Sequence, residues 1–176
     1  HLLSISQFIM GDITKVNAVA TTVFPKRPKS AGSTEMVDVE NEDIMTFMAE
    51  YANGAIGQIA CSRVATGRKN YLTYEIQGTK GSVRYDLERM GEVQVYFQSD
   101  NERDRGFRTV LLNPLMKGYS AFQPAGGIYI AYNDMKILEV HALFDAITNG
   151  ADYVTDFEFG YKIDRTVAAV IESSKT

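Results

Sequence analysis

The chain has 176 residues, of which 45% are hydrophobic and 23% are charged, and its formal net charge is −4. This length suits one domain with a substantial core, and a mildly acidic chain without a basic face is not expected to bind nucleic acid. The longest uncharged stretch, residues 118–133, is shorter than the roughly 20 residues of a membrane span and contains proline and glycine, so we expect no membrane helix.

The start of the chain predicts a helix, a strand and a loop, in that order. Residues 1–10 place apolar side chains at helical spacing, and Gly11 ends the pattern. Residues 13–24 are rich in valine and threonine, which is typical of a long strand. Residues 24–36 contain two prolines and several small polar residues, so we expect a mobile loop there.

The middle of the chain predicts an antiparallel sheet. Residues 43–52 and 55–65 flank Asn53-Gly54, a pair that can supply the two positive φ angles of a tight hairpin turn. On the polar face of the strands that follow, Tyr71 and Tyr96 would meet water or a second subunit. These strands are expected over residues 71–77, 82–86 and 92–98, where apolar and polar side chains alternate, and over residues 107–112.

Two helices close the chain after a loop over residues 113–133. The first covers residues 134–149 and stops before Gly150, and the second begins at residues 155–158 (TDFE), which fit a capping box. Their apolar stripes are Ile137, Val140, Phe144 and Ile147, then Phe159, Ile163, Val167 and Val170. Strands followed by helices define the α+β class, and we predict an open, mostly antiparallel (mixed) sheet of about six strands with helices packed on one face.

Few side chains form a pattern that indicates chemistry. His1 and His141 stand in no metal-binding spacing, so no metal site is expected, and His141 is interpreted as structural or exposed. The single cysteine, Cys61, excludes a disulfide framework, is interpreted as a small buried residue and fits a cytoplasmic location. A solvated loop explains the acidic group, and no spacing selects the paired carboxylates of a glycosidase. This group consists of Asp38, Glu40, Glu42 and Asp43.

Two further segments bear on binding. Arg63, Arg68 and Lys69 flank a strand junction, where they are either solvated edge charges or a clamp for an anion or for hydroxyl groups. Residues 78–82 (GTKGS) lie between two predicted strands, whereas the G-x-G-x-x-G dinucleotide motif needs a strand followed by a helix. The sequence therefore predicts no nucleotide-binding half within this chain.

Three segments, EIQGTKGSVRYD, AYNDMKILEVHALFDAITNG and DFEFGYKIDRTVAAVIESS, resemble in their order the C-terminal domain of the glucose–fructose oxidoreductase and myo-inositol dehydrogenase (Gfo/Idh/MocA-type) family. The resemblance extends over essentially the whole chain. It implies that residues 1–176 are a substrate-binding and oligomerisation domain whose NAD(P)-binding Rossmann domain lies outside this chain. Without that domain, the chain is expected to be inactive.

The implied activity is that of an NAD(P)-dependent dehydrogenase, which oxidises a secondary alcohol of a sugar, an inositol or a related polyol. NAD or NADP would be bound mainly by the missing domain. A homo-oligomer is expected to form through the open sheet face. The alternative is a non-catalytic ligand-binding or scaffold protein that retains the fold.

The resemblance also implies site residues. The second domain of this family starts with a helix that reads roughly D-x-G-x-H-x-x-D, and His1 falls on the histidine, which acts as proton acceptor or donor beside the nicotinamide. Ser4 replaces the final aspartate of that pattern, and an expression tag stays an alternative origin of His1. The substrate-binding residues expected near the strand junction and before the first C-terminal helix are Arg63, Arg68, Asn70 and Tyr132.

Overall fold

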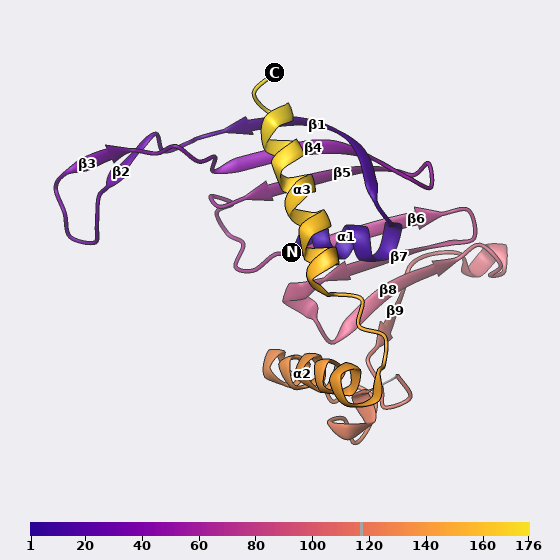
Figure 1. The fold of residues 1–176 in the computed structure, drawn as a ribbon. Helices are drawn as coiled ribbons and strands as arrows, with labels where there is room; N and C mark the ends of the chain where they lie inside the picture. The colour runs from indigo at the N-terminus through magenta and orange to yellow at the C-terminus, as the bar shows by residue number, and fades with distance from the viewer. Residues whose placement is uncertain (117) are drawn as a thin grey trace. The chain divides into compact units, whose positions relative to one another are not determined.

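The computed structural model describes every residue except 117, which lies within a predicted loop. The described chain divides into two compact units, residues 1–67 together with 154–176, and residues 68–153. Each unit combines antiparallel strands with helix, so the predicted α+β class is confirmed (Figure 1).

The helices and strands occur in the predicted order, with additions. The first unit contains α1 (Leu2–Met10), β1 (Ile13–Thr21), β2 (Lys26–Pro28), β3 (Met36–Asp38), β4 (Ile44–Tyr51), β5 (Ile56–Ser62) and α3 (Phe157–Ser173). The second contains β6 (Thr73–Gly78), β7 (Gly81–Asp86), β8 (Glu92–Phe97), β9 (Arg108–Leu111) and α2 (Tyr132–Asn149). Its short 3₁₀ turns are η1 (Leu87–Arg89), η2 (Glu102–Asp104) and η3 (Tyr119–Ala121).

All pairings between the described strands are antiparallel. They form the ladders β1-β4-β5, β2-β3 and β6-β7-β8-β9. In place of one sheet of about six strands, the described residues therefore form nine strands in three ladders. The two strands of each hydrogen-bonded pair are consecutive in the chain, except for β1 and β4. In the sequence, β2 and β3 are inserted between those two strands.

Residues 22–42, which we call the ribbon, connect β1 to β4 and contain β2 and β3. The loop predicted in this region is partly wrong, because three residues on each strand pair with each other. Cross-strand ion pairs fix this register: Lys26 Nζ lies 3.5 Å from Asp38 Oδ1, and Lys29 Nζ lies 3.0 Å from Glu35 Oε1. Figure 1 shows the ribbon extending beyond the β1-β4-β5 ladder.

The hairpin between β4 and β5 is confirmed, but its turn differs from the prediction. Gly54 has a positive φ of 85°, and Asn53 has a negative φ. Tyr51 O accepts a hydrogen bond from Gly54 N at 2.9 Å, and Tyr51 N donates to Ala55 O at 2.9 Å. The connection is therefore a three-residue loop that ends in one left-handed glycine, not a two-residue turn with two positive φ angles.

The core of the first unit lies between the β1-β4-β5 ladder and one layer of helix. Leu2 and Leu3 of α1 and Val170 of α3 pack on the same cluster, so both helices cover one face of this ladder, as predicted. Alternate residues of β4 point into the core, as the two-residue period of a strand requires. The buried apolar members are Ala18, Met45, Phe47, Ala49, Tyr51, Ile59 and Val170.

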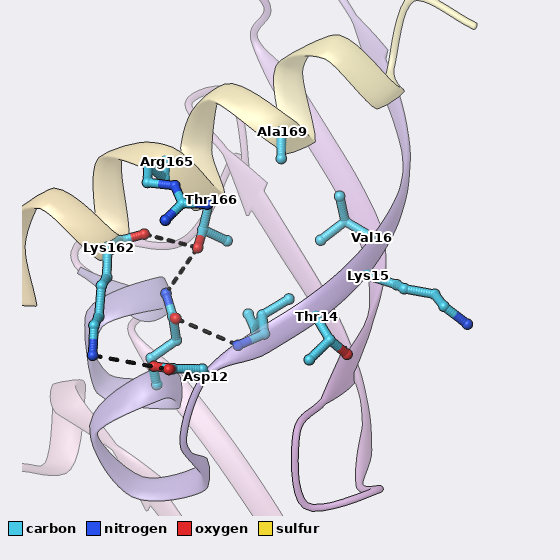
Figure 2. A pocket seen from close by; sticks show the side chains of 10 residues that line it. Asp12, Thr14, Lys15, Val16, Lys162, Arg165, Thr166 and Ala169 are labelled. Atoms are coloured by element: carbon cyan, nitrogen blue, oxygen red, sulfur yellow. Dashed lines mark hydrogen bonds and ion pairs between the residues drawn. The ribbon is translucent and has the colours of Figure 1, made fainter.

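Polar contacts join the two helices to each other and to β1. Gln7 is buried, and its Nε2 donates to Thr166 Oγ1 on α3 at 3.1 Å (Figure 2). At the other end of α3, Ser173 Oγ accepts a hydrogen bond from Ala18 N at 3.1 Å. Because β1 is an edge strand, this contact satisfies a backbone group that the ladder leaves unpaired.

The β6-β7-β8-β9 ladder of the second unit alternates as predicted. Its polar face includes Tyr96, whereas Tyr71 precedes β6 and lies outside the strands. The apolar face is half-buried or exposed throughout and consists of Tyr74, Ile76, Val83, Tyr85, Val93, Val95, Phe97 and Val110.

A buried amide holds the loop after β9 in place. Gln123 is 1% exposed, and its Nε2 donates to Leu112 O at 2.9 Å and to Ile128 O at 2.6 Å.

The helix α2 begins two residues earlier than predicted. Ala131 N donates to Asp134 Oδ2 at 2.7 Å, which satisfies a backbone donor at the start of this helix. The expectation that its apolar stripe packs on a sheet is wrong for the described chain, because these side chains are half-exposed or more. They are Ile137 (55%), Val140 (50%), Phe144 (60%) and Ile147 (70%).

The helix α3 begins one residue later than the predicted capping box. Asp156, and not Thr155, is the N-cap, and its Oδ1 accepts a hydrogen bond from Phe159 N at 2.8 Å. Both residues are good caps, and the aspartate adds a negative charge at the positive end of the helix dipole.

Replacing Thr166 with valine should lower the free energy of unfolding of the first unit by roughly 1–3 kcal/mol, because the buried Gln7 amide loses its partner. In urea unfolding, Gln7→Leu combined with Thr166→Val should cost less than the sum of the single changes, since the two residues interact directly. The control is Ser174→Ala, which removes an exposed hydroxyl of α3 and should change stability by less than about 0.5 kcal/mol. Additive losses in the double variant would contradict the proposed coupling.

Candidate functional site

A polar cavity of about 370 Å³ lies at the base of the ribbon. Its volume falls within the range of small-molecule sites, roughly 300–1,000 Å³. The cavity combines cationic, anionic and amide side chains, which suits a ligand that both donates and accepts hydrogen bonds. Its lining residues are Arg27, Asp38, Val39, Glu40, Asn41, Asp43 and Arg63.

Asp43 fixes the geometry of this cavity. Its main-chain N donates to Thr21 O at 2.9 Å, and its main-chain O accepts from Arg63 N at 2.8 Å. Its carboxylate accepts from Phe24 N at 3.0 Å and from Arg27 Nη2 at 2.9 Å, and its side chain is 4% exposed. The interpretation of this residue as part of a solvated acidic loop is therefore wrong, because the carboxylate is buried and fully engaged.

The surroundings of Asp43 favour its charged form. The hydrogen bond from Phe24 N–H is the main cause that lowers the pKa of the Asp43 carboxyl, and the Arg27 guanidinium acts in the same direction. Burial opposes both effects, but the net result is a pKa below the ordinary value. Asp43 is thus a carboxylate at neutral pH and serves to position its neighbours, not to transfer protons.

Arg63 is the one predicted substrate-binding residue that lines this cavity. The hydrogen bond to Asp43 fixes its main chain, while its side chain is exposed and forms no ion pair with any residue that the structure describes. A guanidinium of this kind can donate to hydroxyl or carboxylate oxygens of a ligand.

His1 is exposed and occupies the N-cap position of α1. Its main-chain O accepts from Ser4 Oγ at 2.7 Å and from Ile5 N at 3.0 Å, so Ser4 closes the first turn of the helix. Cys61 is exposed, so its interpretation as a small buried residue is wrong, and partial burial raises the pKa of its thiol.

The other predicted residues belong to the second unit. The Arg68 guanidinium lies 3.7 Å from the centroid of the Tyr71 ring and 3.5 Å from Glu88 Oε2. Asn70 is exposed, and its main-chain O accepts from Leu72 N at 2.9 Å. Arg68 and Asn70 therefore share the segment before β6. Tyr132 is the first residue of α2, is 54% exposed, and has Lys136 Nζ 5.6 Å from its ring centroid.

A second cavity, of about 440 Å³, was not predicted from the sequence (Figure 2). It lies between α1, β1 and α3 and has the buried Gln7–Thr166 hydrogen bond in its wall. Lys162 Nζ lies 3.9 Å from Asp12 Oδ2 at its rim. No predicted site residue lines this cavity.

The described residues do not provide a dinucleotide cradle of the strand–glycine-loop–helix kind. Gly78 and Gly81 pair with each other across the turn between β6 and β7, so the glycine-rich segment joins two antiparallel strands. Across the described residues, no set of three histidine, cysteine or acidic side chains is grouped for a metal ion. None of the described helices combines the length and the apolar character that crossing a membrane requires.

Comparison with known proteins gives consistent matches. Residues 1–84 match the family described as the GFO/IDH/MocA C-terminal domain. Levoglucosan dehydrogenase of Pseudarthrobacter phenanthrenivorans is 36% identical over 187 aligned positions, which cover 99% of this chain and 47% of that protein. The chain thus spans about half the length of this relative.

Solved structures extend the similarity to the fold. A levoglucosan dehydrogenase in complex with NADH and L-sorbose has a TM-score of 0.94 at 36% identity, over 99% of this chain and 47% of that chain. An NAD-binding oxidoreductase from Klebsiella pneumoniae has a TM-score of 0.91 at 36% identity, over 99% of this chain and 46% of that chain.

Replacing Asp43 with asparagine should destabilise the first unit in a pH-dependent manner. Because the folded-state pKa of Asp43 is lowered, its stabilising contribution is present above the unfolded-state pKa, about 3.9, and is lost as the pH falls through the folded-state value. Urea unfolding should therefore show a stability gap between wild type and Asp43→Asn that is constant near neutral pH and narrows below about pH 4.

The matched control for this experiment is Asp38→Asn, which removes an exposed carboxylate paired with Lys26. Exposed ion pairs contribute little, so this change should alter stability by less than about 1 kcal/mol. A gap for Asp43→Asn that is equally wide at pH 3 and pH 7 would contradict the electrostatic role of Asp43.

Proposed function

The chain belongs to the GFO/IDH/MocA family of oxidoreductases, and from this premise we propose that residues 1–176 form the substrate-binding and oligomerisation domain of an NAD(P)-dependent dehydrogenase. The proposed substrate is a sugar, an inositol or a related polyol, which is oxidised at a secondary alcohol. The observation that carries the proposal is the similarity over 99% of the chain to a levoglucosan dehydrogenase bound to NADH and L-sorbose. The cytoplasm is the proposed location.

We propose that the cofactor is held by a part of the protein outside this chain. The glycine-rich turn between β6 and β7 does not fit a dinucleotide pyrophosphate, because no helix follows it. A bound nicotinamide would supply hydride transfer. The NADH-bound relative supports NAD(H) as cofactor, while NADP is the alternative. Isothermal calorimetry tests this division: micromolar affinity of residues 1–176 alone for either dinucleotide would contradict it.

His1 is the proposed proton acceptor. Oxidation of an alcohol releases a proton from the hydroxyl oxygen, and a neutral imidazole within hydrogen-bond reach can accept it. The position of His1 at the exposed start of α1 supports this role, because its side chain makes no capping hydrogen bond to the helix. Ser4, which stands where the family pattern has an aspartate, donates to the main chain of His1.

Arg63, Arg68, Asn70 and Tyr132 are the proposed substrate-binding residues. Support is most direct for Arg63, whose unpaired guanidinium lines a cavity of suitable size. Arg68 is already stacked on Tyr71 and close to Glu88, so we assign it a weaker contact with the substrate. Asn70 and Tyr132 are exposed and can donate to or accept from hydroxyl groups.

Self-association through an open sheet face is also proposed. The outer face of the β1-β4-β5 ladder, which points away from α1 and α3, contains no charged residue over nine neighbouring positions. These are Asn17, Val19, Thr21, Ile44, Thr46, Met48, Gln58, Ala60 and Ser62. A solvated antiparallel face normally carries charges, whereas interface cores are depleted in them.

The test of the proposed function uses the full-length protein that contains this chain. Purified protein is mixed with NAD or NADP and a panel of sugars and polyols that includes levoglucosan, and cofactor reduction is followed by absorbance. Dehydrogenation of at least one compound is expected. Complete absence of activity, with ligand binding retained, would favour the alternative of a non-catalytic binding protein.

Replacing His1 with asparagine in the full-length protein should lower kcat by roughly 10²–10⁴-fold, because general-base assistance is lost. KM should change little, since the proposed role of His1 lies in proton transfer and not in binding. The matched control is His141→Asn, which alters an exposed histidine of α2 and should leave kcat unchanged. Wild-type turnover in the His1 variant would disprove the assignment of His1 but not that of the dehydrogenase.

A further inference from the structure

We propose that the ribbon, residues 22–42, is an arm that packs on a second copy of this chain, against the outer face of the partner's β1-β4-β5 ladder. The inference rests on the self-association proposed above and adds the element that makes the contact. It follows from the exposed apolar side chains of the ribbon, from its ion pairs and prolines, and from the mostly uncharged surface that the outer face of the ladder presents.

The ribbon exposes more apolar surface than an isolated pair of short strands can keep in water. Phe24 and Met36 are each 51% exposed, Val23 is 46% exposed and Val37 is 37% exposed. A two-stranded hairpin alone is marginally stable, and the pairing here covers only three residues on each strand. Burial of these side chains against another surface would stabilise the ribbon.

The base of the ribbon is held firmly, which suits an arm with a defined direction. Asp43 binds Phe24 N and the Arg27 side chain, and Thr22 Oγ1 donates to Asn41 O at 3.2 Å. Val39 N donates to Pro25 O at 2.9 Å. An element that is anchored at its base and exposed beyond it loses little additional entropy when it docks.

The contact is expected to use side chains and not added strands. Pro25 and Pro28 lack the N–H donors that a further strand would need. Lysines on the same strand also disfavour edge-to-edge pairing. The ribbon is thus protected from open-ended sheet growth but retains an apolar surface for docking.

Charge favours a second copy as the occupant. The cations Lys26, Arg27 and Lys29 are paired with Asp38, Asp43 and Glu35, and the other charged residues of the ribbon are the acidic Glu40 and Glu42. The ribbon therefore presents no positive field that would select a nucleic acid. The outer face of the ladder carries one charged pair at its end, Lys15 with Glu50 at 3.1 Å, and is otherwise uncharged. Its Val19 (70%) and Met48 (49%) are exposed. A two-fold axis would place each ribbon on the other copy's ladder, so that one contact type covers both apolar surfaces.

Analytical ultracentrifugation of the full chain over a concentration series tests the arm. The double variant Phe24→Ser/Met36→Ser should raise the dissociation constant by at least about tenfold, since burial of two large apolar side chains is lost. Val19→Lys should weaken association in the same way, because it places a charge on the docking face. Phe157→Ser is the control: this aromatic residue is 98% exposed on α3, outside the ribbon, and its loss should leave the dissociation constant unchanged.

A photo-crosslinking amino acid at position 36 supplies an independent readout. We expect covalent dimers, with the crosslink mapped by mass spectrometry to β1, β4 or β5 of the other copy. An oligomer that is sensitive to Val19→Lys but not to the ribbon variant would overturn the arm and leave self-association standing. A wild-type monomer at all concentrations would overturn both proposals, and crosslinks confined to one chain, or equal weakening by Phe157→Ser, would overturn the arm.

Discussion

One buried carboxylate holds together the part of the molecule to which the candidate site belongs. Asp43 binds the end of β1 through Thr21, the ribbon through Phe24 and Arg27, and the residue after β5 through Arg63. A charged group in such a position is tolerated only because each of its oxygens has a donor. The cavity at the base of the ribbon, the direction of the ribbon and the position of the Arg63 main chain all depend on this residue.

The two units differ in how they bury apolar surface. The first unit has a core of fully buried side chains between a three-stranded ladder and two helices. In the second unit, the sheet side chains are half-buried at most, and the apolar stripe of α2 is exposed in the described chain. Apolar faces of this extent are typical of domains that meet further protein surface, which agrees with a chain that spans about half the length of its relatives.

Periodicity was sufficient to predict most of the regular structure. The alternation in β4 to β8 and the helical spacing of α1, α2 and α3 all correspond to observed elements. The ribbon was missed because Pro25 and Pro28 are typical of loops, whereas its pairing depends on cross-strand ion pairs that local patterns do not reveal. The start of α3 was displaced by one residue because Thr155 and Asp156 are both acceptable caps and only the tertiary structure selects between them.

The candidate site was less accessible to prediction than the fold. Arg63 was identified from its place at a strand junction. Asp43 was assigned to a solvated acidic group, because a sequence does not show which of several neighbouring carboxylates faces a backbone donor and an arginine. Family resemblance supplied the role of His1, which its own surroundings do not specify. The cavity between α1, β1 and α3 brings together residues from opposite ends of the chain, and no local signal marks it.

The hydroxyl of Ser173 has a consequence for handling the protein. It accepts a hydrogen bond from the backbone N–H of Ala18 on the exposed margin of β1, at the last residue of α3. Unwinding the last turn of α3 would uncover a strand margin able to recruit other strands and would promote precipitation.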